Sequence, residues 1–218
     1  MNSTEILETF REEMNDEADP PLWSDTLLFR YLDDAQKTFC RWTEGIEDSS
    51  TAEITRLAVV SGTEWYALDK RVLKVREAVD VSTGRPFGLY SAERASDAGI
   101  YFDGRPAQLK AFVTGLSKNM LRAWPFPNNT ATVELRVFRL PLVPITDAGD
   151  QELEIDEQHH LSLLLWMKHR AYGKEDAETF DRSKRDDFEQ RFQAYCARAK
   201  AEQVRLRHPA GTVQYGGY

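Results

Sequence analysis

Cysteine is scarce in this sequence, and its two copies have no metal-type spacing. Cys40 and Cys196 are the only cysteines among 218 residues. Metal sites and disulfide frameworks are built from cysteines at short, recurring spacings, so the sequence predicts neither. Both residues fall in predicted helices beside apolar neighbours, and we expect them to be reduced thiols in a core.

A long hydrophobic run is also missing. The segment MNSTEILETFREEM at residues 1–14 has neither an apolar signal core nor a basic leader. The most apolar stretch, residues 161–167, is too short to span a bilayer. These features predict a chain that is made and assembled in a cytosol and has no membrane partner.

The motifs of common enzymes are absent. The sequence contains no phosphate-binding loop, no Gly-x-Gly-x-x-Gly, no Gly-x-Ser-x-Gly and no catalytic-type cysteine setting. We therefore predict that the protein is not an enzyme and holds no cofactor. An enzyme that assembles an acidic site from scattered residues is the weaker alternative, and it would show clustered carboxylates with shifted pKa values in a pocket.

The four histidines do not form a metal-binding pattern. His159 and His160 are adjacent on a predicted helix, where neighbouring side chains point about 100° apart and cannot readily share one metal ion. His169 lies farther along the same helix, and His208 lies near the end of the chain. Hydrogen bonding of ring nitrogens at a packing surface is the better interpretation.

Adjacent acidic residues are also interpreted without a metal site. Asp33-Asp34 and Asp186-Asp187 fall on predicted helices and are typical of solvated faces. The acidic run at residues 175–178 lacks the spacing of an EF-hand loop. No metal site is predicted.

Charge is unevenly distributed. The formal net charge is −8, and residues 1–50 carry a large excess of acids. From Ala197 onward the chain has four bases and only one acid. An acidic body is a poor candidate for direct nucleic-acid binding, but it suits a surface past which nucleic acid slides without sticking.

Four helices are predicted from apolar spacing and capping residues. Ser3 or Thr4 caps a first helix that ends near Met14, and Ser24 caps a second, strongly amphipathic helix that ends at Gly45. Asp156 begins a third helix, whose apolar residues at 161–167 occupy nearly every direction around the axis, and which ends at Gly173. Asp181 caps a fourth helix with one narrow stripe. That stripe comprises Phe188, Phe192 and Tyr195.

The middle of the chain is predicted to be a β module. Residues 54–60 and 64–68 are predicted to form a hairpin around Ser61-Gly62, and residues 132–140 are the clearest strand. Residues 72–81, 85–90, 107–113 and 120–124 are further strand candidates. Short strands at this spacing favour an antiparallel sandwich.

The predicted fold class is therefore α+β, with an antiparallel β-sandwich-like module inserted into a small helical bundle. The predicted parts are bundle helices at 1–50, the β module at 51–145, a helical hairpin at 146–197 that completes the bundle, and an extended C-terminal arm at 198–218. Residues predicted to pack within the bundle or between subunits are Leu161, Leu164, Leu165, Trp166, Phe188 and Phe192.

Three stretches together resemble the bacteriophage head-to-tail adaptor (connector) proteins, most closely those of short-tailed phages. The first is LWSDTLLFRYLDDAQKTFCRWT at 22–43 with the TAEITRLAVVSGTEWYALDKRVLKVREA stretch at 51–78. The second is VELRVFRLPL at 133–142 with ELEIDEQHHLSLLLWMKHRAYGKEDAETFD at 152–181. The third is the terminal GTVQYGGY at 211–218.

The resemblance implies a structural role at the head–tail junction of a virion. It implies a ring, usually of twelve copies, that binds the portal protein, extends the DNA channel without specific DNA binding, and offers a docking surface to tail tube, nozzle or fibre proteins. It also implies assembly in the host cytoplasm and a C-terminal arm that docks on the portal. In this sequence the arm residues are Arg205, Arg207, Val213, Tyr215 and Tyr218.

A β-sandwich binding module is the main alternative. Trp65, Tyr66, Tyr101 and Trp124 lie in the β module, and an aromatic-lined surface there would bind a glycan or another protein. Core packing is the competing explanation for the same residues.

Overall fold

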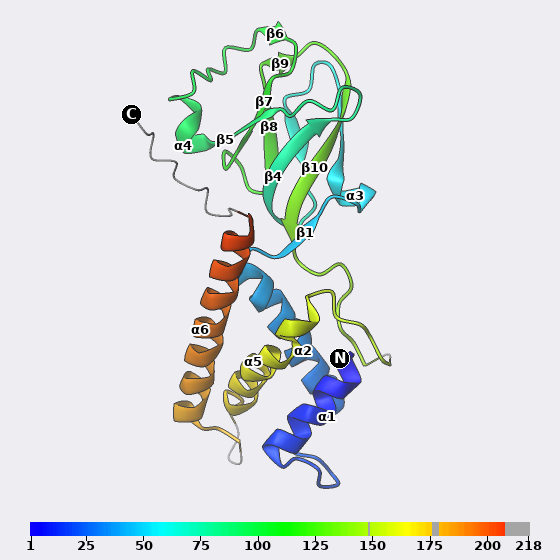
Figure 1. Cartoon of the computed structure of the whole chain (residues 1–218), viewed down its shortest axis with the longest axis vertical. Coiled ribbons are helices and arrows are strands. Elements are labelled where there is room, and N and C mark those ends of the chain that lie inside the picture. Colours follow the sequence, from blue (N-terminus) through cyan, green and yellow to red (C-terminus); the bar gives the residue numbers. More distant parts are fainter. Residues whose placement is uncertain (148, 176–178, 208–218) are drawn as a thin grey trace, which may run out of the picture. The chain divides into compact units, whose positions relative to one another are not determined.

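The computed structural model describes residues 1–147, 149–175 and 179–207, and the chain divides into two compact units (Figure 1). The helical unit comprises Met1–Glu44 and Pro141–Tyr218, and the β unit comprises Gly45–Leu140. The long helices belong to the first unit and the strands to the second. The predicted α+β fold class is confirmed.

Two helices open the helical unit, α1 (Ser3–Met14) and α2 (Asp25–Trp42). The residue that caps α1 is Asn2, so the prediction of Ser3 or Thr4 was wrong by one or two positions. The Asn2 side chain accepts a hydrogen bond from the Glu5 N–H, and the Glu5 carboxylate accepts one from the Asn2 N–H, each at 2.9 Å. This reciprocal pair satisfies two helix-terminal donors. Ser24 lies at the N-cap of α2, as predicted, although its side chain makes no capping hydrogen bond.

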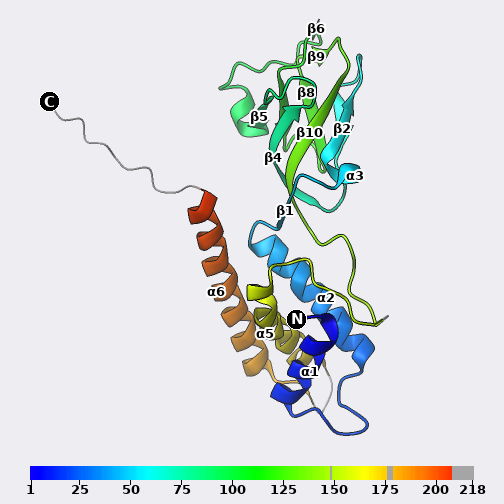
Figure 2. The same ribbon diagram turned by 45° about the vertical axis from the view of Figure 1, so that its right-hand side comes forward.

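The second pair of helices is a hairpin, α5 (His160–Tyr172) and α6 (Arg182–Arg207), preceded by the short helix η1 (Glu157–His159). Asp181 accepts a hydrogen bond from the Lys184 N–H at 3.0 Å, which is the predicted cap of α6. Figures 1 and 2 both show α5 between α6 on one side and α1 with α2 on the other. This position explains why α5 is the most apolar helix of the unit.

The end of α6 corrects the prediction of an extended arm from residue 198. Residues 198–207 continue α6, because their Ala, Lys, Glu, Gln, Arg and Leu content strongly favours helix. Predicted arm residues Val213, Tyr215 and Tyr218 lie outside the described residues.

The first sheet of the β unit is built on its longest central strand, β10 (Ala131–Arg139). Val133, Leu135 and Val137 are buried on β10, and Glu134 and Arg136 alternate with them on the exposed side, as predicted. Along one edge, β10 pairs antiparallel with β4 (Val72–Asp80). Along the other edge it pairs antiparallel with two short strands, first β2 (Arg56–Val59) and then β1 (Ile46–Asp48).

The second sheet has the order β3-β8-β7-β5, and a two-stranded sheet joins β6 to β9. The pairs β5–β7 and β6–β9 are parallel, which departs from the purely antiparallel module that was predicted. The remaining elements of the unit are β3 (Trp65–Ala67), β5 (Gly88–Ser91), β6 (Pro106–Ala107), β7 (Ala111–Thr114), β8 (Met120–Trp124), β9 (Phe126–Pro127), α3 (Ala52–Thr55) and α4 (Ala92–Ala95).

The predicted hairpin at 54–68 was wrong. β2 and β3 follow each other around Gly62, whose φ of +82° fits a turn, but they join different sheets. β2 pairs with β10 and β3 pairs with β8, so both partners lie far along the sequence.

A buried ion pair lies where the chain enters and leaves the β unit. Ile46 at the start of β1 lies opposite Arg139 at the end of β10. The Arg139 guanidinium donates a hydrogen bond of 2.5 Å to Asp48, and the Thr51 hydroxyl donates another at 2.7 Å to the same carboxylate oxygen. Burial alone would raise the pKa of Asp48, but these hydrogen bonds outweigh it and hold the pKa well below its usual range.

Candidate functional site

An aromatic cluster fixes the α5–α6 hairpin against α2. The Trp166 ring on α5 meets Trp42 edge-on, with ring centroids 5.2 Å apart, and lies 5.4 Å from Phe192 on α6. His169 stacks on Trp166 at 4.6 Å. Phe192 is fully buried, so three helices share one aromatic centre.

The apolar residues of α5 fall into a buried set and an open set. Leu163, Leu164 and Met167 are buried, but Leu161 is 58% exposed and Leu165, one turn later, is half-buried. Apolar residues occupy nearly every direction around α5, as the sequence indicates, but the side that carries Leu161 is not covered. The helices that contact α5 cover the sides that hold the buried set and leave the Leu161 side open.

The open side of α5 forms a groove with α6. This hairpin groove has a volume of about 440 Å³ and is lined on its apolar side by Leu161, Leu165, Phe188 and Tyr195. Two cations frame it: the Lys168 ammonium lies 5.5 Å and the Arg191 guanidinium 5.3 Å from the centre of the Phe188 ring. Lys168 also pairs with Glu13 on α1. The groove is thus an apolar strip whose rim carries two ion-paired cations, Lys168 with Glu13 and Arg191 with Asp187.

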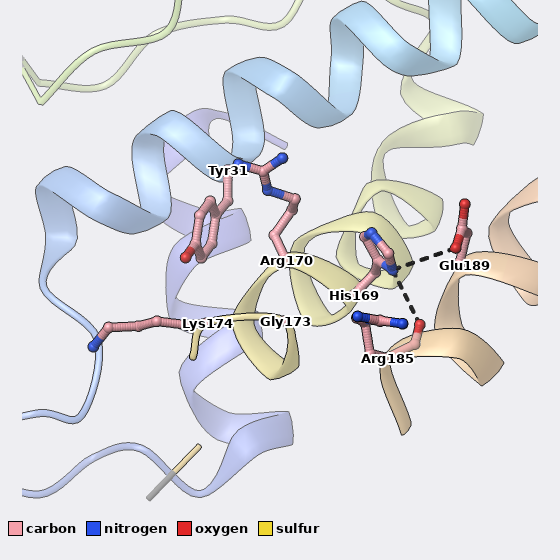
Figure 3. A pocket seen from close by; sticks show the side chains of 7 residues that line it. All are labelled: Tyr31, His169, Arg170, Gly173, Lys174, Arg185 and Glu189. Carbon is pink, nitrogen blue, oxygen red and sulfur yellow. Dashed lines mark hydrogen bonds and ion pairs between the residues drawn. The ribbon is translucent and has the colours of Figure 1, made fainter. Parts of the chain in front are cut away.

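A second concavity, the basic pocket, lies where α5 ends and α6 begins (Figure 3). Its volume is about 540 Å³, and the residues that line it are Tyr31, His169, Arg170, Gly173, Lys174, Arg185 and Glu189. His169 Nδ1 lies 3.0 Å from the Arg185 carbonyl oxygen and 4.0 Å from a Glu189 carboxylate oxygen. Three cationic side chains and one carboxylate line this pocket, but Arg170 already pairs with Asp34 and Arg185 with Asp186.

The predicted histidine pair is buried and hydrogen-bonded. His159 Nδ1 lies 2.9 Å from the Tyr195 hydroxyl, and His160 Nε2 lies 2.9 Å from the Ile155 carbonyl oxygen. Burial lowers the pKa of His159, which favours its neutral form. Within the described ranges, no group of three or more His, Cys, Asp or Glu residues is placed to hold a metal ion. His208 lies outside those ranges.

The acidic pairs differ from one another. Asp33 accepts a hydrogen bond from the Ile145 N–H at 3.1 Å, and Asp34 accepts one from the Trp166 indole N–H at 2.8 Å. The prediction of a simple solvated face was therefore wrong for this pair, because both carboxylates join α2 to other segments. Asp186 and Asp187 form ion pairs along the exposed side of α6. Residues 176–178 of the acidic run lie outside the described residues.

The four predicted aromatic residues of the β unit differ in their exposure. Tyr66 is buried and its hydroxyl donates to the Thr63 carbonyl at 2.8 Å, and the Trp124 indole donates to the Tyr101 carbonyl at 2.9 Å. Of the four predicted residues, Trp65 and Tyr101 are exposed, at 38% and 69%, and Trp124 is half-buried. The binding-module hypothesis loses the continuous Trp65–Tyr66–Trp124 patch on which it depended.

Both cysteines are free and buried, as predicted. Burial raises the pKa of Cys196 to about 12. Of the described helices, none is both long enough and apolar enough to cross a membrane.

Comparison with protein families identifies the family of this chain. A profile of the SU10 adaptor protein family matches residues 1–214, nearly the whole chain. The chain belongs to this family. The resemblance to phage head-to-tail adaptors is confirmed, and the adaptor is a structural protein of the virion. A search of curated proteins finds no match.

The six residues predicted to pack within the bundle or between subunits lie in two places, the core of the helical unit and the hairpin groove. Leu164 and Phe192 are in the core, and Trp166 is half-buried beside them. The other three, Leu161, Leu165 and Phe188, line the hairpin groove, to which Leu164 also contributes. The basic pocket was not predicted, although the KHR at 168–170 and the RSKR at 182–185 flank the connector and were a signal for it.

Proposed function

We propose that twelve copies of this adaptor form a ring at the head–tail junction, which joins the portal to the tail and extends the DNA channel. The observation that carries the proposal is the family match over residues 1–214. The open hairpin groove supports it, because a folded helical unit that exposes large apolar side chains in a groove has a surface suited to another protein. Assembly would take place in the host cytoplasm.

The ring contact is assigned to the hairpin groove. A ring of identical subunits needs a heterologous contact, in which one patch of each subunit meets a different patch of the next. Leu161, Leu165 and Phe188 supply apolar area, and the rim cations Lys168 and Arg191, each paired with an acid of its own subunit, would also accept an acidic neighbour. The many acids of residues 1–50 offer such a neighbour on the next subunit.

The portal contact is assigned to the end of the chain. Arg205 is exposed on the last turns of α6, and Arg207 pairs there with Glu44. We expect the segment that follows, with Val213, Tyr215 and Tyr218, to dock on an acidic surface of the portal. Tail tube, nozzle or fibre proteins would bind other surfaces of the ring.

The charge of the adaptor fits passage of DNA without specific binding. The net charge of −8 repels phosphate groups, so DNA slides without specific binding.

Native mass spectrometry of the purified adaptor, alone and with its candidate portal ring, tests the proposal. A ring that forms alone or only on the portal would support it and give the copy number. A monomer that ignores the portal would contradict it.

A further inference from the structure

A groove lies between two strand edges of the β unit. The Asp80 N–H donates to the Arg85 carbonyl at 2.9 Å, and the Phe87 N–H donates to the Ala78 carbonyl at 2.8 Å. Residues 85–87 therefore run beside the last part of β4. The chain then continues as β5, which pairs with β7 in the other sheet. The first part of β4 and the edge of β5 consequently flank a groove of about 480 Å³.

The β5 side of this groove is an open strand edge. The Gly88 N–H donates to the Lys110 carbonyl at 3.0 Å, so it points toward β7. Backbone N–H groups alternate in direction along a strand, and those of Leu89 and Ser91 therefore point away from β7. Among the described residues, β7 is the only strand that pairs with β5. An unpaired edge of this kind is a template for another strand.

The side chains around the groove are apolar and basic. Leu73, which is 40% exposed, Val75, Leu89 and Met120 line it, together with Lys74 and Lys118. None of the lining residues is acidic. Lys118, in the turn between β7 and β8, is exposed and forms no ion pair with any residue that the structure describes.

We infer that the β5 edge accepts an extended, acidic peptide segment from a partner protein, which adds as a strand between β5 and β4. The open N–H groups of Leu89 and Ser91 would pair with its backbone. Apolar side chains on one face of the added strand would cover Leu73, Val75 and Met120, and a carboxylate would meet Lys118. The partner segment is acidic because it faces Lys118, and it is extended because it pairs with a strand edge. The inference does not depend on ring formation.

Amide hydrogen exchange of the full chain tests the inference, with a synthetic strand peptide as the probe. The peptide is acetyl-Thr-Val-Glu-Val-Thr-Val-Thr-amide, and its Lys-for-Glu version is the charge control. We expect the acidic peptide to slow exchange at Leu89 and Ser91. Gly88 and Tyr90, whose N–H groups face β7, are internal references, and their exchange should not change.

The K118E variant should bind the acidic peptide about fivefold more weakly, because reversing the charge of this exposed residue turns its attraction to the peptide carboxylate into a repulsion. The matched variant K110E, outside the groove lining, should bind like the wild type.

Three results would overturn the inference. The first is unchanged exchange at Leu89 and Ser91 with saturating acidic peptide. The second is equal binding of the basic peptide. The third is protection of these amides in the protein alone that disappears on removal of residues 208–218, which would show that the end of this chain fills the groove.

Discussion

The indole N–H of Trp166 on α5 donates a hydrogen bond of 2.8 Å to the carboxylate of Asp34 on α2. The same ring contacts Trp42 and Phe192, so one side chain connects α2, α5 and α6. Trp166 is only half-buried, and its energetic role rests on these contacts rather than on complete removal from water.

Truncation of Trp166 should destabilise the helical unit. We expect W166A to lose about 3 kcal/mol of unfolding free energy, because the aromatic contacts are replaced by a cavity. W166F keeps most of the ring area and loses the hydrogen bond to Asp34, and it should lose about 1 kcal/mol. Urea unfolding followed by far-UV circular dichroism measures both. An alanine variant with an unchanged unfolding midpoint would contradict this account.

A charge in the hairpin groove should block assembly without unfolding the chain. Leu161 is 58% exposed, so L161E places its carboxylate in water in the free subunit. In the proposed ring contact the same carboxylate would be buried, and we expect no ring by native mass spectrometry. L206E is the matched control, because Leu206 on α6 is 82% exposed and lies outside the groove lining. Ring assembly by L161E at the level of L206E would refute the assignment.

The ion pair of Asp48 should make stability depend on pH. The pKa of Asp48 in the folded protein lies below the ordinary value of 3.8, since hydrogen bonds from Thr51 and Arg139 outweigh burial. Above about pH 4 the unfolded chain also carries a charged Asp48, and the full stabilisation is present. At lower pH the unfolded chain takes up the proton first, so the unfolding free energy falls as pH falls.

The variant D48N should lose about 3 kcal/mol at pH 7, because Arg139 is left buried without its carboxylate. Its unfolding free energy should then fall less between pH 5 and pH 3 than that of the wild type. Denaturant titrations at the two pH values measure the difference, with D97N at an exposed aspartate as the control. Parallel pH dependence in wild type and D48N would show that Asp48 does not contribute.

Removal of residues 208–218 should strongly weaken portal binding and leave the helical unit folded. The deletion keeps all of α6 and the Arg207–Glu44 pair. We expect at least about a tenfold loss of affinity for the portal, as for other interfaces that lose their anchoring side chains. Thermal unfolding checks that the deletion variant is folded. K200E, which changes the charge of α6 and keeps residues 208–218, is the control and should bind the portal like the wild type. Wild-type affinity in the deletion variant would show that the portal contact lies elsewhere.

The long helices could be predicted because their information is local. The apolar spacing around Leu28, Leu32 and Phe39 and the cap at Asp181 specify α2 and the start of α6 without reference to the rest of the chain. The last turns of α6 were missed because they carry no apolar stripe. Their helix is favoured by intrinsic propensity, which is a weaker signal than periodicity.

Strand partners were less predictable than strands. The alternation of apolar and polar residues in β10 was clear, but nothing in the sequences of β2 and β3 indicates that they belong to different sheets. Their partners are set by packing against residues that lie dozens of positions away. Similarly, the composition of α5 identified it as an apolar helix but did not show that the side of Leu161 would stay open.

The neighbouring positions of Ile46 and Arg139 have a mechanical consequence. Any tension carried along the backbone from the helical unit enters the β unit at one residue and leaves at its paired neighbour. The tension therefore acts first on the hydrogen-bonded residue pairs at this end of β1 and β10, which the Asp48–Arg139 ion pair also holds together. The remaining strands lie off this line of force, so such tension would leave their pairing unchanged.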